Sequence, residues 1–597
     1  MAKSKAGKFL KIAALIIICL LLAALTTVML YQYLPAHPVN NGAGKFELKQ
    51  FSSSDELSDV LGEYRNYYAT TLDLDGVLSM YKGATSEYDS APNSSENDTS
   101  APSHSETNVQ VEGVDEDDVI KTDGNYIYYL NDTGINILSA KDGATQKLST
   151  IATNAGGMYL YGDILAVVGT EYDSNYAPKT TIAVYDVTDR AAPHLIRAVV
   201  MEGTTLTTRM NDGKIYYILS ADSDTLPKAG DGSSFEEMPA SNAYYFKGVP
   251  YNYFTTLGYV DLNSSDGSAD AYKSYLGAGN IFYMSKDYLY VTATDYSARY
   301  YTNGFRTYAD YSVAGQTRIL KFSLDSLEPV AHANADGTVR DRYSLDEYEG
   351  NFRIATTVGS EGSAVFVFDE NLNPLGEVRG IAPGEQIYSA RFNGDTANIV
   401  TFLQVDPLFK IDLSDPKNIT VSDGLKKDGV SYYLHYIEGT ELLIGLGYDT
   451  YMGATKGIEV VLFDNSGADA VIINTYVIGT DSAYSESLFE PKGILYSKEA
   501  DFFGFPATVY RYDNYSGLQK YYLFGFSTGK LQLRATLSHS PAMDSRYQYI
   551  GGEDLNIPQY DINRAVQIGD YIYAASSRLV TAHDINDAFN ITSITEI

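Results

Sequence analysis

One pattern recurs along most of this chain and restricts its fold more than any other feature. A short strand ends in a turn such as DG, GD or EG, and a strand rich in Tyr, Ile or Val follows; a strand that ends near Asp and a return strand complete the unit. The turn dipeptides supply the positive φ that tight hairpins need, and alternating polar and apolar residues suit half-buried strands. The chain from residue 108 onwards is therefore predicted to be all-β.

The second strand of the unit is the easiest to find, and we count nine copies of it. The nine segments are NYIYYL (125–130), DILAVVG (163–169), KIYYILS (214–220), DYLYVTA (287–293), FRIATTV (352–358), TANIVTF (396–402), ELLIGLG (441–447), DFFGFPA (501–507) and DYIYAAS (570–576). Repeated four-stranded units are typical of β-propellers, which usually have about four to eight blades. We predict a β-propeller of eight or nine blades, with nine the direct count.

An array of β-sandwich domains is the alternative arrangement for so many strands. Separate domains need linkers of different composition, and none interrupts residues 108–597. Radial repetition in one ring is therefore favoured. The segment NVQV (108–111) could close the ring by pairing with the last blade.

The N-terminus carries a predicted membrane anchor. An uncharged apolar run extends from Ile12 to Leu30, and four lysines precede it. At about 1.5 Å per residue the run reaches roughly 28 Å, close to the hydrocarbon thickness of a bilayer. Because lysines favour the cytoplasmic side, residues 1–34 are assigned to a cytoplasmic tip and a single transmembrane helix, and the rest to the outside of the cell membrane. Cleavage as a signal peptide, which would yield a secreted protein, is the alternative.

Residues 35–107 are predicted to form an extracytoplasmic stalk. Within it, residues 51–68 place Leu57, Val60, Leu61 and Tyr64 at helical spacing, which predicts one amphipathic helix. Residues 82–107 are polar and acidic with few apolar side chains, so they are expected to be a disordered linker.

The charge balance narrows the class of partner. The chain has 76 acidic and 43 basic residues, a formal charge of −33. Such a surface repels phosphate backbones, which argues against nucleic acid, and it suits divalent cations or basic partners. Simple solubility is the alternative explanation of the charge. The only cysteine, Cys19, lies in the predicted transmembrane run, so the outer domain has neither a disulfide nor a thiolate metal site.

Several motifs resemble a family of predicted secreted or membrane-anchored prokaryotic proteins with a C-terminal β-propeller distantly related to WD repeats. They include TNVQVEGVDEDDVIKTDGNYIYYL (107–130), which opens the domain, and VDPLFKIDLSDP (405–416). The resemblance implies a propeller outside the cytoplasm and supplies no biochemical activity. Where relatives tend to have Asp-His-Lys, this chain has Glu490, Pro491 and Lys492.

A cluster of acidic residues near residue 115 is a candidate metal site. Hard cations such as Ca²⁺ bind six to eight oxygen ligands, and carboxylates beside a turn can supply them. The spacing does not match an EF-hand loop, and the other interpretation is a surface or blade-lining role. The candidate ligands are Asp115, Glu116, Asp117, Asp118 and Asp123.

A second set of candidates follows from the propeller architecture, because the first strand of each blade lines the axial channel. Charged side chains on these strands would converge on the axis, where they either pair with one another and fill the channel or form a ligand site at its mouth. The candidates are Lys121, Arg209, Asp346, Arg391, His435, Glu486, Lys492 and Arg564.

Enzyme signatures are mostly missing from the sequence. It has no G-x-S-x-G elbow, no H-E-x-x-H spacing and no P-loop. The favoured hypothesis is a binding or scaffold module for a peptide, a wall component or another envelope protein. A hydrolase or lyase that uses channel-mouth carboxylates and His435 as acid and base is the alternative.

Overall fold

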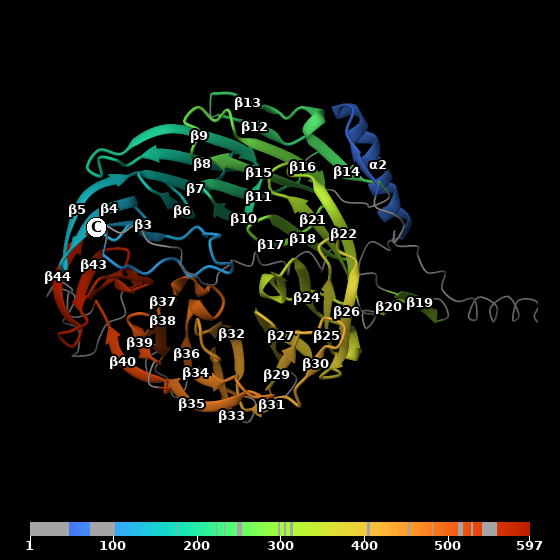
Figure 1. The fold of residues 1–597 in the computed structure, drawn as a ribbon. Helices are drawn as coiled ribbons and strands as arrows, with labels where there is room; N and C mark the ends of the chain where they lie inside the picture. The colour runs from blue at the N-terminus through green and yellow to red at the C-terminus, as the bar shows by residue number, and fades with distance from the viewer. Residues whose placement is uncertain are drawn as a thin grey trace, which may run out of the picture.

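Nine β-sheets surround a common axis in this protein and confirm the predicted propeller with nine blades (Figure 1). The computed structural model describes residues 47–71 and 102–597, except 175, 223, 232, 248–252, 296–298, 304–305, 311–314, 403–405, 452–453, 480–481, 511–516, 527–528 and 540–557. All nine predicted second strands are strands in the structure. The predicted transmembrane run lies outside the described residues, and no described helix is long and apolar enough to span a bilayer.

The first three blades include the two largest sheets. Blade 1 consists of β2 (Ile120–Thr122), β3 (Tyr126–Asn131), β4 (Gly134–Lys141) and β5 (Ala144–Ile151). Blade 2 consists of β6 (Gly157–Tyr161), β7 (Ile164–Tyr172), β8 (Pro178–Asp186), β9 (His194–Glu202), β12 (Lys228–Gly230) and β13 (Phe235–Glu237). Blade 3 consists of β10 (Thr204–Asn211), β11 (Lys214–Asp222), β15 (Tyr253–Asp261), β16 (Ala271–Leu276), β14 (Ala243–Phe246) and β1 (Leu48–Gln50).

Blades 4 to 6 follow the repeating unit more closely. Blade 4 consists of β17 (Ile281–Met284), β18 (Tyr288–Asp295), β21 (Gln316–Ser323) and β22 (Pro329–Asp336), with the hairpin β19 (Arg299–Asn303) and β20 (Arg306–Asp310) inserted between β18 and β21. Blade 5 consists of β23 (Leu345–Tyr348), β24 (Asn351–Thr357), β25 (Ser363–Phe368) and β26 (Pro374–Ile381). Blade 6 consists of β27 (Gln386–Asn393), β28 (Thr396–Phe402), β29 (Asp406–Asp412), β30 (Thr420–Val421) and β31 (Leu425–Lys427).

The last three blades complete the ring. Blade 7 consists of β32 (Val430–Tyr436), β33 (Leu442–Tyr451), β34 (Ala454–Asp464) and β35 (Val471–Ile478). Blade 8 has a divided inner strand and consists of β36 (Ser482–Tyr484), β37 (Leu495–Ser497), β38 (Phe502–Tyr510), β39 (Gly517–Gly525) and β40 (Gln532–Leu537). Blade 9 consists of β41 (Arg564–Ile568), β42 (Tyr571–Ala575), β43 (Leu579–Asp584) and β44 (Asn590–Glu596).

The hydrophobic core lies between blades rather than within any one of them. Tyr290 of blade 4 stacks on Phe352 of blade 5, with ring centroids 4.3 Å apart, inside one apolar cluster shared by the two blades. Because both faces of a blade are covered, the second strands are nearly continuous buried runs, whereas an outer strand such as β44 alternates exposed and half-buried residues. Half-buried alternation, expected for every strand, is therefore wrong for the second strands.

A segment before blade 1 crosses the axial channel and contacts most of the ring. We call residues 103–118 the axial segment. Its backbone pairs with Ile568 of blade 9, with Met210 of blade 3 and with Met158 of blade 2, and the Gln110 side chain donates to the Leu345 carbonyl of blade 5 at 3.3 Å. The segment thus joins blades that are far apart in the chain.

The ring closes by contacts between blades 1 and 9. Thr145 on β5 donates its backbone N–H to Ser593 Oγ on β44 at 3.1 Å, and Ile127 and Tyr573 share one apolar cluster. The part of the axial segment that pairs with the last blade is residues 103–105, a few residues before the predicted 108–111.

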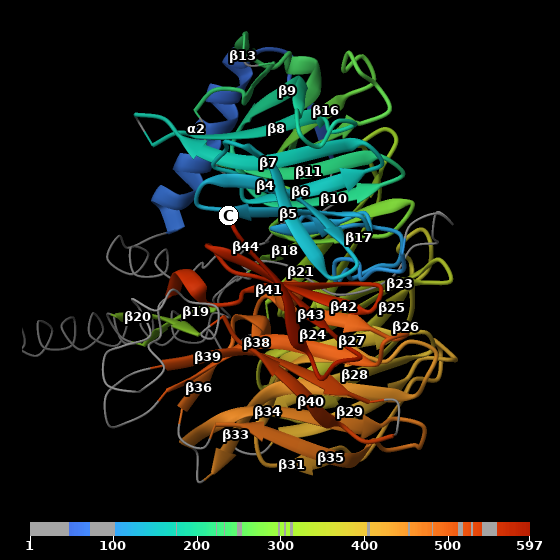
Figure 2. The same ribbon diagram turned by 90° about the vertical axis from the view of Figure 1, so that its left-hand side faces the viewer.

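The helix predicted near residues 51–68 is present as α2 (Ser54–Thr71), and it lies against the propeller (Figure 1). The buried side chains of Phe51, Leu57 and Leu61 pack against Phe254 of blade 3, and β1 extends that blade by pairing with β14. The predicted stalk over residues 35–107 is therefore interrupted by a segment that belongs to the folded domain. Figure 2 shows α2 on the same side of the disc as the β19–β20 hairpin.

Candidate functional site

The acidic cluster of the axial segment and the basic side chains of the blades meet at the centre of the ring. Each of the four consecutive acidic side chains at 115–118 forms an ion pair with a basic side chain from elsewhere in the chain. These basic side chains are Lys121, Arg209, Arg342, Lys492 and Arg564. Four of the five predicted acids and four of the eight predicted channel residues, Lys121, Arg209, Lys492 and Arg564, thus meet in one cluster of ion pairs.

Glu116 is the most enclosed member of this cluster of ion pairs, with none of its surface exposed. Arg342, in a short 3-10 turn before β23, donates from its two terminal nitrogens to the carboxylate at 2.6 and 3.1 Å. Arg209 of β10 lies 3.6 Å from the same carboxylate. Burial would raise the pKa of Glu116, but Arg209 and Arg342 outweigh burial and lower this pKa to about 2. Glu116 is therefore ionised.

Lys121 of β2 holds the axial segment to blade 1. Its Nζ donates to Asp115 Oδ1 at 2.8 Å, to Thr107 Oγ1 at 2.7 Å and to the Glu116 carbonyl at 2.6 Å. These three hydrogen bonds use all three N–H donors of the Lys121 ammonium group. Burial still raises the pKa of the Asp115 carboxyl, with Lys121 opposing it.

The remaining two acids pair with blades 8 and 9. Lys492 lies 3.1 Å from Asp117, and Arg564 Nε donates to Asp118 Oδ1 at 3.0 Å. Burial would raise the pKa of Asp117, and Lys492 lowers it overall. Gly157 leaves room for Asp117, because a Cβ there would lie 2.2 Å from its carboxylate oxygen.

The four carboxylates diverge toward separate cations. Among the described residues, no group of three or more His, Cys, Asp or Glu side chains is placed to hold a metal ion. Asp123, the fifth candidate, lies in the turn after β2, accepts hydrogen bonds from two backbone N–H groups and pairs with Arg190 at 3.1 Å. The arrangement thus places protein cations beside the carboxylates that the sequence offered as candidate Ca²⁺ ligands.

Two other predicted channel residues form local contacts outside this cluster of ion pairs. Asp346 of β23 pairs with Arg353 on the neighbouring strand β24. The Arg391 guanidinium of β27 lies over the Tyr343 ring, 5.3 Å from its centroid. Position on an inner strand therefore does not by itself bring a side chain to the axial segment.

His435 is buried, so the structure does not place it at a channel mouth. None of its surface is exposed, and its ring lies 4.4 Å from Tyr496 and 5.4 Å from Phe503, centroid to centroid. Burial and the nearby Arg391 lower its pKa to about 3. A neutral imidazole enclosed in this way lacks the access that a general acid or base requires.

Two residues remain to be compared with the predicted channel set: Glu486, which belonged to it, and Arg342, which did not. Glu486 lies in a 3-10 turn and is exposed. Arg342 was missed, because it precedes the first strand of blade 5 and no periodic position marks it. The sequence did contain a signal for such a buried basic partner. The consecutive acids of VDEDD need Lys or Arg side chains beside them if the segment lies inside the protein.

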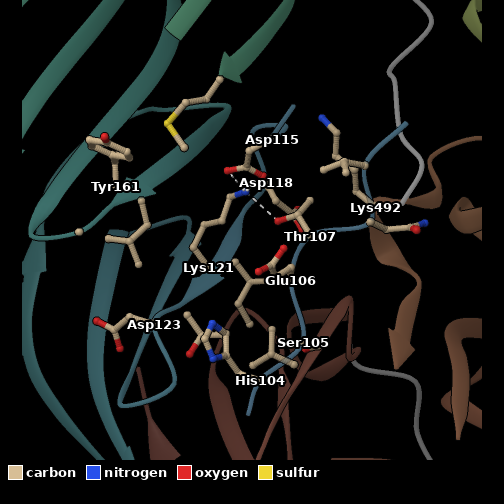
Figure 3. Close-up of a pocket in the computed structure, with 18 of the residues that line it drawn as sticks. His104, Ser105, Glu106, Thr107, Asp115, Asp118, Lys121, Asp123, Tyr161 and Lys492 are labelled. Atoms are coloured by element: carbon tan, nitrogen blue, oxygen red, sulfur yellow. Dashed lines mark hydrogen bonds and ion pairs between the residues drawn. The ribbon is translucent and has the colours of Figure 1, made fainter. Parts of the chain in front are cut away.

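A cavity of about 700 Å³ lies between the axial segment and the ends of the inner strands (Figure 3). Its walls come from the axial segment and from blades 1, 2, 3, 8 and 9. In Figure 3, Lys121 reaches between Asp115 and Thr107, while Tyr161 and Lys492 lie on opposite sides. The volume falls within the range of about 300–1,000 Å³ that is common for ligand sites.

The cavity wall carries more acids than bases. Its acidic residues are Glu106, Asp115, Asp118, Asp123, Asp163 and Asp212, and its Lys and Arg residues are Lys121, Arg190 and Lys492. Arg190 is held by Asp123 and Asp163 at 3.1 and 2.5 Å. Arg564, which pairs with Asp118 from outside the lining, adds a fourth base, and the acids that remain in excess favour a ligand with positive charge.

Comparisons with known proteins agree with the architecture. A family model described as a beta propeller domain matches residues 104–588. An uncharacterized protein of Archaeoglobus fulgidus is 25% identical over 618 residues, covering 88% of this chain and 94% of the relative. One from Methanocaldococcus jannaschii is 28% identical over 487 residues, covering 69% and 76%.

Solved structures share only low overall similarity with this chain. A putative 6-phosphogluconolactonase from Bacteroides uniformis has a TM-score of 0.31 at 12% identity, covering 59% of this chain and 92% of that chain. The C-terminal WD40 domain of Sif2 has a TM-score of 0.31 at 9% identity, covering 66% and 95%. Such values carry no functional argument.

Proposed function

This chain belongs to the beta propeller domain family, and from that premise we propose that it acts as a membrane-anchored, extracytoplasmic binding or scaffold module. Its ligand is a peptide, a wall component or another envelope protein that presents a positively charged group. The anchor is the apolar run from Ile12 to Leu30, with the N-terminus cytoplasmic and the propeller outside.

The observation that carries this proposal is the axial cavity. Its acidic residues outnumber its basic ones, and the Lys121 ammonium is already fully hydrogen-bonded within the protein. Four of the six wall carboxylates are paired with Lys121, Arg564 or Arg190. A ligand amine or guanidinium would therefore be attracted by the remaining negative charge of the wall and would contact Asp212. The surrounding ion pairs keep the wall in place without a ligand, which favours binding because little ordering has to occur on association.

The hydrolase or lyase alternative gains no support from this geometry. It required His435 beside channel-mouth carboxylates, whereas His435 is enclosed by Tyr433, Tyr496 and Phe503. The carboxylates of Asp115 and Asp118 are themselves paired with Lys121 and Arg564.

Binding and turnover can be measured on one panel of envelope peptides and wall fragments. We expect saturable binding to the full chain, weakened about tenfold or more by the double substitution Tyr161→Ala and Asp212→Asn, since truncated hot-spot residues cost about 2 kcal/mol or more. Tyr161 lines the cavity and Tyr172 lies at the opposite end of blade 2, so Tyr172→Ala is the matched control.

Turnover is the second measurement on the same panel. We expect no product from any member of the panel. Product formation that disappears in His435→Ala would show an enzyme, and binding unaffected by the cavity substitutions would place the ligand elsewhere.

A further inference from the structure

Aromatic side chains form a row on the rim opposite the cavity, across blades 6, 7 and 8. We call these residues the aromatic row; its members are Tyr388, Phe402, Tyr432, Tyr448, Tyr484, Phe489 and Tyr510. Tyr388 and Tyr432 lie near the starts of the inner strands β27 and β32, whereas the cavity lies at the ends of the inner strands. Figure 2 shows β33 and β36 on the side of the disc that carries α2.

Five of the seven rings of the row are in continuous contact. Ring centroids lie 5.3 Å apart for Tyr388 and Phe402, and 5.9 Å apart for Tyr388 and Tyr432. Tyr432 then lies 5.8 Å from Tyr448 and 5.3 Å from Phe489. All four pairs meet edge to face, an arrangement that aromatic quadrupoles favour. These contacts fix the orientation of the five rings in the absence of a partner.

One end of the row is open to solvent. Phe489 is 50% exposed, Tyr484 45% and Tyr510 40%. Strands β36 and β38 pair Ser482 with Tyr510 and Tyr484 with Thr508, so Tyr484 and Tyr510 are diagonal neighbours on one face of blade 8. Burial, together with the hydroxyl groups of Tyr484, Tyr432 and Tyr510, raises the pKa of Tyr448 to about 12. Grouped, exposed aromatic side chains of this kind are characteristic of interaction surfaces, where Tyr and Phe are enriched.

One acidic side chain, Glu486, lies beside the open end. Glu486 is exposed, and it raises the pKa of the adjacent Tyr484 in addition to burial. Lys427, at the end of β31, is neutralised by its ion pair with Glu459. Glu486 and the ring faces together therefore attract cations.

The chain already places one cation on the row. The exposed Arg340 guanidinium lies 5.8 Å from the centroid of the Tyr388 ring. A guanidinium within about 6 Å of a ring face is attracted by the ring quadrupole. The other exposed rings, with Glu486 beside them, offer the same interaction to a group from outside.

We propose that the aromatic row is a second binding surface, which holds a Lys- or Arg-containing segment of another protein. The aliphatic stems of the basic side chains pack on the rings of Tyr484, Phe489 and Tyr510, and their charged ends face Glu486. A chain with a formal charge of −33 also attracts such a partner over long range. This surface is separate from the axial cavity and does not depend on a ligand there.

The test uses the full chain in a non-ionic detergent and two labelled peptides, one of alternating Arg and Ser and one with Gln in place of each Arg. Fluorescence anisotropy should show saturable binding of the Arg peptide and binding of the Gln peptide weaker by about tenfold, because the Gln peptide offers no cation to the rings or to Glu486. Higher salt should weaken the Arg peptide more than the Gln peptide. Equal affinities for the two peptides would overturn the proposal.

Substitutions place the bound peptide on the row. Phe489→Ala should weaken the Arg peptide about fivefold to tenfold and Glu486→Gln about threefold, because a ring contact and an exposed charge contribute unequally. Tyr176, 85% exposed in the hairpin after β7, is the matched control, and Tyr176→Ala should change nothing. A loss in Tyr176→Ala as large as that in Phe489→Ala would contradict the assignment.

Two further measurements distinguish the aromatic row from a glycan-binding surface and from the axial cavity. A neutral chito-oligosaccharide that binds in a Phe489-dependent way, while the Arg peptide does not bind, would identify the row as a glycan surface and overturn the proposal. The axial cavity is also proposed to bind cationic groups, so the Arg peptide is measured against Tyr161→Ala as well as Phe489→Ala. Loss of binding in Phe489→Ala but not in Tyr161→Ala supports the row, whereas loss in Tyr161→Ala but not in Phe489→Ala would place the peptide in the cavity and overturn the proposal.

Discussion

Glu116 and Arg342 form a two-pronged ion pair across 226 residues of chain, with nitrogen–oxygen distances of 2.6 and 3.1 Å. Glu116 is 0% exposed and Arg342 is 2% exposed. Since buried charges must be neutralised, this pair couples the position of the axial segment to the start of blade 5.

Glu116→Gln should destabilise the protein strongly. The amide keeps the shape of the side chain but leaves Arg342 and Arg209 buried without their counter-charge, which costs about 3–5 kcal/mol. Thermal unfolding followed by circular dichroism should show a clearly lower Tm.

The matched control for that substitution is Glu47→Gln. Glu47 pairs with Lys247 at 3.3 Å, and both side chains are more than half exposed, at 57% and 59%. Exposed pairs contribute about 0–1 kcal/mol, so its Tm should stay close to that of the wild type. Equal Tm values for both variants would mean that Glu116 is not a stabilising centre.

Removal of divalent cations should leave the Tm unchanged. The carboxylates at 115–118 are each paired with a Lys or Arg side chain, so they have little remaining affinity for Ca²⁺. Differential scanning calorimetry with EDTA and with millimolar Ca²⁺ makes the comparison. A rise in Tm with Ca²⁺ that Asp117→Asn abolishes would contradict this prediction and support the candidate metal site of the sequence.

Leu57→Ala should release α2 from blade 3. Leu57 is fully buried against the propeller, and truncation of a buried leucine costs about 2–5 kcal/mol. In the part of the helix whose side chains are described, Leu61 and Val60 are the other apolar side chains of this contact. We therefore expect faster amide exchange over residues 48–62 without loss of the nine-bladed fold. Ser58→Ala, at the exposed neighbouring position, should show wild-type exchange. Unchanged protection in Leu57→Ala would mean that other contacts hold the helix.

The protein should lose stability as the pH falls below about 6.5, the pKa of histidine in an unfolded chain. Burial lowers the pKa of His435 and of His539 to about 3, so the unfolded chain takes up these protons first. Each group then costs about 2 kcal/mol near pH 5, and the loss continues down to about pH 3. Burial raises the pKa of Asp561 to about 6, which acts in the opposite direction.

Chemical denaturation near neutral pH and near pH 5 measures this loss. His435→Gln should reduce the difference in stability between the two pH values, because glutamine takes up no proton when the chain unfolds. His194, which is exposed, serves as the control position, and His194→Gln should leave the difference unchanged. Equal stability of the wild type at both pH values would contradict the prediction.

The strands could be predicted because each signal is local. NYIYYL and DYIYAAS have apolar and aromatic residues bounded by turn dipeptides, and they correspond to β3 and β42. The site could be predicted only in part, since Lys121, Arg209, Lys492 and Arg564 do meet the axial segment, whereas Asp346 pairs with Arg353 on the next strand. Partner choice depends on side-chain direction and on blade geometry, which periodicity does not contain.

The amino-acid sequence alone determined the β class, the nine repeating units and the acidity of the chain, because hydrophobic pattern, turn chemistry and composition are local or additive properties. Only the tertiary structure decided where residues 103–118 lie, that Glu116 meets Arg342, that His435 is enclosed, and that aromatic rings from three blades share one rim. These relationships join residues separated by tens to hundreds of positions, and they exist only once nine sheets have closed around one axis.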